Sequence, residues 1–342
     1  MATSTAASYK ALVFDQTGEP LDVLQLKDMP PAPAELKEGE VELKFLQSSI
    51  NPSDVNTVQG KYPISPKLPG AVPGHEGVAE VVRTGPKVDR LSPGDWVVPM
   101  APSQGTWRSG GVFAAAGWHP VPKDIGLVAA STLIINPPSA LAMLEIFHPL
   151  QPGDTVAQNG ATSAVGEAVI QIAKARGIRT INVIRDRPDM EATVARLKGL
   201  GADLVTTEEN LKDDLAASGL PAPMLGLNCV GGSAASAVSR ILKDGGTLVT
   251  YGGMSMQQVT APTAAMIFKD ISFRGFWLSG RWAAAQGPAG RAASLDAIVQ
   301  LYREGKLVPP QVQAFPLTSW KAAFEALAQP HRGKKVVLDC TA

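Results

Sequence analysis

Cysteine is scarce in this chain: only Cys229 and Cys340 occur among 342 residues. Two thiols cannot form a disulfide framework or a four-thiolate zinc site, so the sequence excludes a disulfide-stapled secreted scaffold and a zinc ribbon. Both cysteines lie in apolar runs that predict β-strands. Free thiols at such positions are typical of a protein from a reducing compartment.

An excess of charge of one sign and long apolar runs are also missing. Lys and Arg total 31 and Asp and Glu total 31, so no global field draws the protein to nucleic acid or to an anionic membrane. No uninterrupted apolar run reaches about 18 residues, so no membrane span is expected. With 45% hydrophobic residues, the 342-residue chain predicts a globular protein of two domains or one large one.

Glycine and proline are abundant, with 33 and 28 residues, and predict many tight turns. From Tyr9 to about Lys123 they separate short strand-like runs: Ala11 to Phe14, Val41 to Leu46, Gly77 to Val82 and Trp96 to Pro99. This texture predicts a mostly β, partly barrel-like domain with a polar, turn-rich loop at Asn51 to Gly60. It returns in Val312 to Phe315 and Lys335 to Leu338, so the tail is expected to pack on this first domain.

After about Ala129, apolar strands alternate with turns and amphipathic helices. The predicted strands are Thr155 to Gln158, Ile181 to Ile184, Leu204 to Thr206, Leu225 to Val230 and Thr247 to Tyr251, and the predicted helices are Ala164 to Arg176, Met190 to Leu200 and Ala234 to Leu242. Because parallel strands need crossover helices, the alternation predicts a doubly wound α/β domain. Such a domain binds its ligand at the carboxyl ends of the strands.

The first of these strands leads into Asn159 to Gly166, a run of small residues before a predicted helix. Small residues let the backbone approach a phosphate, and the free amides at the helix start bind anions. A strict G-x-G-x-x-G pattern is absent, so the turn fits a dinucleotide site and a purely architectural role about equally.

The second strand ends in Arg185, Asp186 and Arg187, about twenty residues after the turn, where dinucleotide folds contact the adenosine ribose. The two guanidinium groups predict a 2′-phosphate partner. Asp186 alone would instead favour the 2′-hydroxyl of NAD, and a solvated turn is the structural alternative.

Two further strand ends carry glycine and aromatic residues. The fifth strand ends in Tyr251, Gly252, Gly253 and Met254, and a later one ends in Phe276, Trp277, Leu278 and Ser279. At the carboxyl edge of the sheet these residues are placed to contact a nicotinamide and its ribose or to line a substrate pocket. Taken singly, each is better explained as a core or turn residue, and only their recurrence at strand ends favours a function.

The order of these motifs resembles the medium-chain dehydrogenase/reductase superfamily over essentially Tyr9 to Leu338. Several stretches are more specifically similar to mitochondrial trans-2-enoyl thioester reductases: Ile50 to Asn56, Gln59 to Tyr62, Gly105 to Arg108, Asn182 to Pro188, Leu227 to Gly232 and Gly275 to Ser279. The resemblance implies a GroES-like β-rich catalytic domain over residues 1–128, completed by residues 311–342. It also implies a Rossmann NADPH-binding domain over residues 129–310.

The same resemblance implies roles for individual residues. Tyr62, in a Gln-Gly-Lys-Tyr segment, matches the family's proposed proton donor, and Asn136 matches a cofactor-binding asparagine. The other implied NADPH contacts are Thr162, Ser163, Ala164 and Val165, Arg185, Asp186 and Arg187, Tyr251, Gly252, Gly253 and Met254, Phe276, Trp277, Leu278 and Ser279, and a lysine that is Lys335 or Lys334. Without the resemblance, Tyr62 beside Pro63 is better explained as a packing residue at a domain edge.

The sequence departs from the family pattern at three places. Ala164 stands where many relatives have glycine, and Pro138 to Leu141 replaces a segment with threonine and tyrosine; both changes concern cofactor fit more than reaction type. The stretch His75-Glu76-Gly77 resembles zinc alcohol dehydrogenases instead. A catalytic zinc needs about three protein ligands, and Pro52 to Asp54 stands where those enzymes place a cysteine. No metal site is therefore expected, and His75 is interpreted as a structural or pocket-wall residue.

Residues and resemblance together predict an NADPH-dependent reductase of trans-2-enoyl thioesters that acts in fatty-acid synthesis. The enoyl group of the substrate is expected to be carried by acyl carrier protein or coenzyme A. The alternative within the superfamily is a quinone or enone reductase, and the alternative outside enzymes is an NADPH-binding regulatory module. The resemblance also implies a homodimer, with the apolar run Phe273 to Leu278 as a candidate sheet edge. It implies the mitochondrial matrix as location. The cytoplasm stays open, because Met1 to Ser8 lack arginine and are too short for an ordinary presequence.

Overall fold

The computed structural model describes residues 8–101 and 103–342, so all of the segment Met1 to Ser8 except its last residue lies outside the described residues. The chain forms two compact units. Unit 1 comprises the residues up to 135 together with 288–303 and 308–342, and unit 2 comprises 136–287 and 304–307. None of the helices formed by the described residues is both long and apolar enough to cross a membrane.

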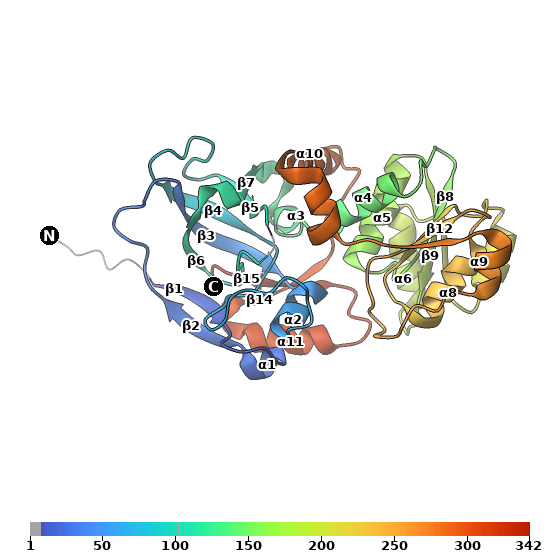
Figure 1. Ribbon diagram of the computed structural model, residues 1–342, viewed down its shortest axis with the longest axis horizontal. Coiled ribbons are helices and arrows are strands. Elements are labelled where there is room, and N and C mark those ends of the chain that lie inside the picture. The colour runs from blue at the N-terminus through green and yellow to red at the C-terminus, as the bar shows by residue number, and fades with distance from the viewer. Residues whose placement is uncertain (1–7, 102) are drawn as a thin grey trace. The chain divides into compact units, whose positions relative to one another are not determined.

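Unit 1 is rich in β-structure, as predicted (Figure 1). Its strands are β1 (Tyr9–Val13), β2 (Gln25–Met29), β3 (Glu40–Ser49), β4 (Gly77–Thr84), β5 (Trp96–Pro99), β6 (Gly110–Ala114), β7 (Trp118–Val121), β14 (Val312–Pro316) and β15 (Lys335–Asp339). Its helices are α1 (Pro20–Val23), α2 (Pro52–Val58), α3 (Leu127–Ser131), α11 (Trp320–Ala328) and, from residue 288 onward, α10 (Ala283–Arg303). Short 3₁₀ turns occupy Ala115–Gly117, Lys123–Ile125 and Leu317–Ser319.

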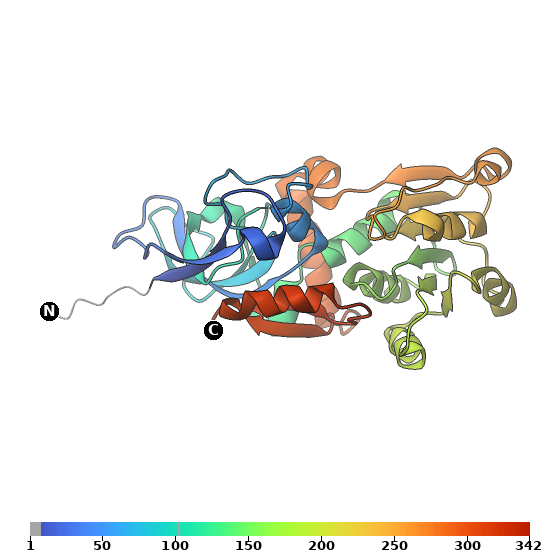
Figure 2. The same cartoon turned by 90° about the horizontal axis from the view of Figure 1, so that it is seen from below.

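The main sheet of unit 1 has the order β14-β15-β3-β4-β5-β7, and β6 also pairs with β3. Strand β3 is its centre, because it pairs antiparallel with β15, β4 and β6 along different parts of its length. Alternate residues Val41, Leu43 and Phe45 are fully buried, which fits the period of two of a strand with one face in the core. Figure 2 shows α11 lying alongside β14 and β15, and this carboxyl-terminal segment is part of unit 1.

The segment predicted as a polar loop at Asn51 to Gly60 is instead mostly the helix α2. Pro52 occupies its first turn, where a missing amide hydrogen costs nothing. The Asp54 carboxylate accepts the Asn51 amide at 2.7 Å and so satisfies a donor at the helix start. Val58 is fully buried at the other end, so packing and capping together outweigh the poor helix propensity of this stretch.

Unit 2 has the predicted alternation of strands and helices. Its strands are β8 (Thr155–Asn159), β9 (Arg179–Ile184), β10 (Leu204–Thr207), β11 (Leu225–Asn228), β12 (Thr247–Thr250) and β13 (Ser272–Gly275). Its helices are α4 (Asn136–Ile146), α5 (Ala164–Ala175), α6 (Met190–Leu200), α7 (Leu211–Ser218), α8 (Gly232–Ile241) and α9 (Thr263–Lys269), with a π-helical turn at Leu278–Trp282. The strands are all parallel in the order β10-β9-β8-β11-β12-β13, which is a doubly wound sheet.

Two apolar clusters lie against this sheet. Residues of α7, α8 and α9 pack with Ala157, Ile181 and Leu248 in one cluster. Residues of α5 and α6 pack with Ile184 and Ala161 in the other. Helices therefore cover both faces of the sheet (Figure 1), and the carboxyl ends of the strands stay available at the point between β8 and β11 where the strand order reverses.

Two predicted strands end earlier than the sequence suggested. Strand β11 stops at Asn228 rather than Val230, because the amides of Cys229 and Val230 donate to the Asn159 side chain instead of a neighbouring strand. Strand β13 stops at Gly275 rather than Leu278, where the chain turns into the π-helical segment. The cysteines also lie just beyond strands rather than within them: Cys229 follows β11, and Cys340 follows β15.

The borders of the two units differ from the predicted domain borders at 128/129 and 310/311. Residues 129–135 and 288–303 belong to unit 1. Side-chain hydrogen bonds explain this grouping: Ser131 donates to Gln47 at 2.7 Å, and Arg303 donates to Asp124 at 2.9 Å.

Candidate active site

The turn between β8 and α5 has the geometry of an anion-binding site. Gly160 has a φ of 63°, a conformation that glycine adopts without strain. A side-chain carbon at Gly166 would lie 2.6 Å from the Ala161 carbonyl oxygen, so only glycine lets α5 pack this closely on the turn. The Ser163 hydroxyl caps α5 by accepting the Gly166 amide at 3.1 Å. The amides of Ala164 and Val165, in the first turn of α5, have no acceptor within the helix and are suited to bind phosphate.

The hydroxyl of Tyr251 is a second feature of this edge. It is buried, lies near Cys229 and Ser163, and forms no hydrogen bond with any residue that the structure describes. Burial raises the pKa of Tyr251 well above the ordinary value. A buried hydroxyl without a partner is rare, because burial removes its hydrogen bonds to water and no protein group replaces them. A phosphate or ribose oxygen held at the start of α5 would supply the missing partner. The turn, the helix start and the Tyr251 hydroxyl therefore fit the pyrophosphate region of a dinucleotide.

Two buried asparagines organise the same edge, and the sequence analysis did not single them out. Asn159 Nδ2 donates to Asn228 Oδ1 at 2.7 Å, and Asn159 Oδ1 accepts the amides of Cys229 and Val230 at 2.7 and 3.2 Å. Asn228 Oδ1 also accepts the Gly231 amide at 3.0 Å. The pair fixes the turn after β11 beside the turn after β8. Polar residues ending two strands were the sequence signal that could have identified them.

The predicted adenosine-ribose contacts follow β9 and differ in their surroundings. Arg185 and Asp186 are exposed. Arg187 is bound by Asp189 through two hydrogen bonds, at 2.6 Å to Nε and 3.1 Å to Nη2, and its side chain is only 5% exposed. This ion pair lowers the pKa of Asp189, chiefly through the hydrogen bonds from Arg187. Arg187 is therefore held in one orientation by its neighbour, whereas Arg185 faces solvent.

The predicted contacts after β12 and β13 lie at the same edge of the sheet, because those strands are parallel to β8. Gly253 and Met254 are exposed, whereas Phe276 is buried and packs edge-to-face on Phe147 with ring centroids 6.3 Å apart. The Trp277 ring covers Gly280 so closely that a side-chain carbon there would lie 2.0 Å from the ring. The Trp277 ring therefore leaves no room for a side chain at Gly280.

Tyr62, the predicted proton donor, lies in unit 1 shortly after α2. Its side chain is half-buried, and its ring centroid is 5.5 Å from that of His75. Its amide donates to the Asn56 carbonyl at 3.2 Å, so the end of α2 fixes the backbone at this tyrosine.

His75 is a buried residue whose two ring nitrogens both have partners. The Ser103 amide donates to Nδ1 at 2.9 Å, so Nδ1 carries a lone pair rather than a proton. Nε2 lies 2.9 Å from the Thr57 hydroxyl, whose own hydrogen is donated to the Ser53 carbonyl at 2.8 Å. Nε2 is therefore protonated and donates to Thr57. Both nitrogens are used in this neutral ring, and among the described residues no three His, Cys, Asp or Glu side chains gather as a metal site, so the donors do not fit zinc.

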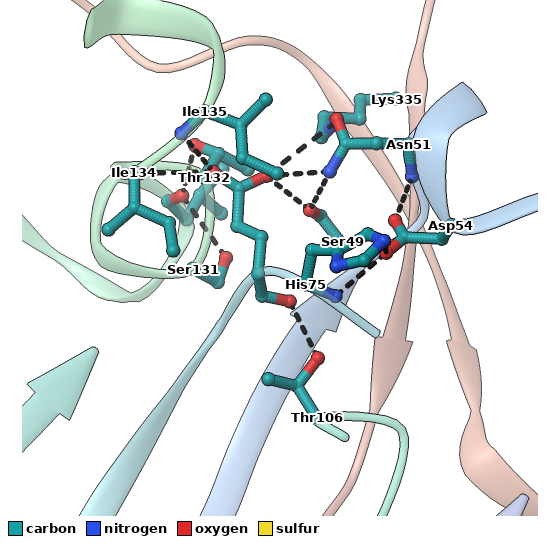
Figure 3. Close-up of polar contacts among 12 residues, drawn as sticks. Ser49, Asn51, Asp54, His75, Thr106, Ser131, Thr132, Ile134, Ile135 and Lys335 are labelled. Atoms are coloured by element: carbon teal, nitrogen blue, oxygen red, sulfur yellow. Dashed lines mark hydrogen bonds and ion pairs between the residues drawn. The ribbon is translucent and has the colours of Figure 1, made fainter. Parts of the chain in front are cut away.

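Beside His75, the buried Glu76 carboxylate accepts hydrogen bonds from Ser49, Asn51, Ile134 and Ile135. Figure 3 labels these four partners. Glu76 Oε1 accepts the amides of Ile134 and Ile135 at 3.0 and 2.9 Å. Its Oε2 accepts the Ser49 hydroxyl at 2.5 Å and the Asn51 side-chain amide at 2.9 Å. In the sequence, Glu76 stands out only as part of the zinc-like motif His75-Glu76-Gly77, which predicts no role for it.

The structure distinguishes the two candidate lysines. Lys334 is exposed, whereas the Lys335 side chain is 9% exposed and reaches the same group of residues. Lys335 Nζ donates to Asn51 Oδ1 at 2.6 Å and lies 4.0 Å from Glu76 Oε2. Burial lowers the pKa of Lys335, and the charges of Glu76 and Asp54 oppose this effect.

Asn136, the other predicted contact outside the sheet edge, is buried and begins α4 directly after Ile135.

Comparison with known proteins agrees with this geometry. Residues 37–130 match the model of the alcohol dehydrogenase GroES-like domain, and residues 164–289 match that of the zinc-binding dehydrogenases. The mitochondrial enoyl-[acyl-carrier-protein] reductase of Rattus norvegicus is 46% identical over 340 residues, which cover 98% of this chain and 90% of that protein. The chain belongs to the mitochondrial enoyl thioester reductases of the medium-chain dehydrogenase/reductase superfamily.

Solved structures of this reductase family have the same fold. The mitochondrial 2-enoyl thioester reductase heterodimer of Candida tropicalis matches with a TM-score of 0.89 and 33% identity, covering 97% of this chain and all of that one. A reductase complex with NADP and crotonyl-CoA matches with a TM-score of 0.90 and 32% identity over the same shares. The predicted family, GroES-like domain and Rossmann sheet are thus confirmed. Although the second matching model is named for zinc, the residues around His75 in this family member do not fit that metal.

Proposed function

We infer that this protein is an NADPH-dependent reductase of trans-2-enoyl thioesters and forms saturated acyl thioesters in fatty-acid synthesis. The observation that carries this inference is the 46% identity to an enoyl-[acyl-carrier-protein] reductase along nearly the whole chain. The related complex with NADP and crotonyl-CoA names the same cofactor and substrate class. The phosphate-suited turn before α5 and the unpartnered Tyr251 hydroxyl support the cofactor from the structure itself.

The residues that hold NADPH are proposed from their placement. The turn Thr162 to Val165 and the Tyr251 hydroxyl take the pyrophosphate, and Arg185 with Arg187 takes the 2′-phosphate. The other proposed contacts are Asn136, Asp186, Gly252, Gly253, Met254, Phe276, Trp277, Leu278, Ser279 and Lys335. When bound, NADPH supplies the hydride for the β carbon of the substrate.

Tyr62 is the proposed proton donor. Addition of hydride to the β carbon places negative charge on the thioester carbonyl oxygen and the α carbon. A phenol hydrogen-bonded to that oxygen lowers the barrier, and its proton or one relayed through it ends on the α carbon. The half-buried position of Tyr62 after α2 supports this role, because the ring is held on one side by His75 while the side chain is still partly exposed.

The natural carrier of the acyl group is proposed to be acyl carrier protein, because the similar Rattus norvegicus protein is named for that substrate. The same relative supports a mitochondrial location, and the matrix is the proposed compartment. A comparison of kcat/KM for crotonyl groups on acyl carrier protein and on coenzyme A tests the carrier. A preference for coenzyme A would contradict the proposal.

A homodimer is proposed for the quaternary structure. β13 is the outermost strand of the parallel sheet, with an edge available to a second copy. Helix α9 nearby exposes Met266, Ile267 and Phe268, with Phe268 79% exposed. Sedimentation should give twice the chain mass, and Phe268→Asp should shift it toward the monomer. A monomeric wild-type protein would contradict the proposal.

The proposed activity is tested by following NADPH oxidation with crotonyl thioester and with a simple quinone under the same conditions. We expect rapid oxidation with the thioester and little with the quinone. The opposite preference would identify a quinone reductase, and no turnover with either, despite NADPH binding, would favour a regulatory module.

A further inference from the structure

Glu76 is a buried carboxylate that the proposed reaction does not use. It is 0% exposed, and four donors surround its two oxygens: the Ile134 and Ile135 amides on Oε1, and the Ser49 hydroxyl and Asn51 amide on Oε2. A carboxylate has no hydrogen of its own, so its two oxygens are suited to accept from four donors. A buried ionised group seldom adds stability over an apolar residue of the same size, so stability alone does not explain its presence.

The segments that donate to Glu76 continue along the chain to proposed site residues. Asn51 precedes α2, and Asn56 in that helix accepts the amide of Tyr62 at 3.2 Å. Ile135 directly precedes Asn136. Figure 3 shows Asn51, Ile135 and Lys335 arranged around one carboxylate, although they lie far apart in the sequence.

Lys335 is tied to the same group through a shared partner. Its Nζ donates to Asn51 Oδ1 at 2.6 Å while Asn51 Nδ2 donates to Glu76, and the Nζ lies 4.0 Å from Glu76 Oε2. The charge of Glu76 thus compensates a buried ammonium group. Removing the negative charge would leave Lys335 facing only Asp54 as a counter-charge within the cluster.

We propose that Glu76 is a positioning residue of the reductase, which sets the separation of three segments of unit 1: those that carry Tyr62 and Lys335, and the one that ends at Ile135 and leads into Asn136. The proposal rests on the proposed function of those three residues. A carboxylate suits the task because its two oxygens accept from backbone and side-chain donors on opposite sides at once. An amide cannot replace it: glutamine keeps one accepting oxygen and turns an NH₂ group toward two of the four donors.

The test compares Glu76→Gln with a matched control, Glu42→Gln. Glu42 is also a buried carboxylate of unit 1, and it accepts hydrogen bonds from Arg83 and Tyr9, neither of which is a proposed site residue. For each purified protein, NADPH affinity is measured by fluorescence titration. The values of kcat and KM and the isotope effect with NADPH deuterated at the transferred position are then measured on crotonyl thioester. Circular dichroism and thermal unfolding report the fold.

We expect Glu76→Gln to fold and to lose about 10²-fold in kcat, the cost of a displacement of about 1 Å at a reacting centre. Its NADPH Kd should rise about tenfold, the size of one lost hydrogen bond. The isotope effect should also rise, because hydride transfer becomes slower relative to the other steps. Glu42→Gln should lower only the melting temperature. The proposal is overturned if the folded Glu76→Gln protein keeps its kcat and its NADPH Kd within about threefold of the wild-type values, because a displaced reacting centre should cost far more. It is also overturned if Glu42→Gln changes kcat and NADPH Kd as much as Glu76→Gln does.

If Glu76→Gln does not fold, Ser49→Ala decides, because it keeps the carboxylate and removes one donor to Glu76 Oε2 together with one acceptor of the Asn51 side-chain amide. A higher NADPH Kd together with a higher isotope effect supports the proposal, and unchanged values overturn it. Failure of the proposed function has a different signature, because the unmutated protein then binds NADPH without reducing crotonyl thioester. In that case the comparison of NADPH affinity among the variants decides alone about Glu76.

Discussion

Replacement of Arg185 or Arg187 by alanine should change the choice between NADPH and NADH. The two cofactors differ only in the 2′-phosphate, and both arginines follow β9 where that group is expected. A hydrogen bond to a charged group contributes about 1.5–3 kcal/mol, which corresponds to about 10- to 150-fold in Kd. NADH therefore serves as an internal control, because it lacks the group that the arginines contact.

The structure predicts that the two substitutions are unequal. Arg185 is exposed, so its contact is partly screened by solvent and its loss should cost near the lower limit, about tenfold in NADPH Kd. Arg187 is held by Asp189 at 2.6 Å and is nearly buried, so it meets the phosphate already oriented. Its removal also leaves the Asp189 carboxylate without its cation. Arg187→Ala should therefore weaken NADPH binding more than Arg185→Ala.

The assay is a fluorescence titration of each variant with NADPH and with NADH at one ionic strength. We expect NADPH Kd to rise in the order wild type, Arg185→Ala, Arg187→Ala, with NADH Kd nearly constant. Equal affinity of the unmutated protein for the two cofactors would refute the reasoning, as would a parallel loss of NADH binding in both variants.

Three further predictions concern single groups. Tyr62→Phe should keep the fold and NADPH affinity but lose about 10²–10⁴-fold in kcat, the usual value of general acid catalysis, whereas a packing role predicts a rate within about threefold. Chelator-treated protein should stay active without stoichiometric zinc, because both His75 nitrogens are used by Ser103 and Thr57; one tightly bound zinc per chain whose removal abolishes activity would contradict this. Burial raises the pKa of the Cys229 thiol and raises that of Cys340 to about 12, so neither should react quickly with a thiol reagent at neutral pH until the protein is denatured, and rapid labelling of the native protein would be the contrary result.

Local sequence signals predicted the architecture of unit 2 well. Alternating apolar strands and amphipathic helices specify a parallel sheet, and the predicted strands recur as β8 to β12. Helix α2 was missed, although Asn51, Pro52 and Asp54 occupy the cap, first and third positions that start a helix. The polar composition of that stretch concealed a local signal that was present.

The Glu76 cluster could not have been predicted in the same way. Its other members come from β3, from the chain before α4 and from β15, whose proximity depends on the sheet pairing of β15 with β3 and the packing of unit 1. A sequence window around His75-Glu76-Gly77 contains none of them. The Tyr251 hydroxyl is similar, because its lack of a partner follows from burial beside Cys229 and Ser163 rather than from any neighbour in sequence.

The most direct test of the proposed activity is the mass of the product formed from crotonyl thioester in deuterium oxide with NADPH deuterated at the transferred position. The account predicts butyryl thioester with one cofactor deuterium at the β carbon and one solvent deuterium at the α carbon, because hydride and proton reach different carbons. Tyr62→Phe should form the same product slowly. Recovery of unchanged crotonyl thioester from the wild-type reaction, with NADPH bound but not consumed, would contradict the central claim.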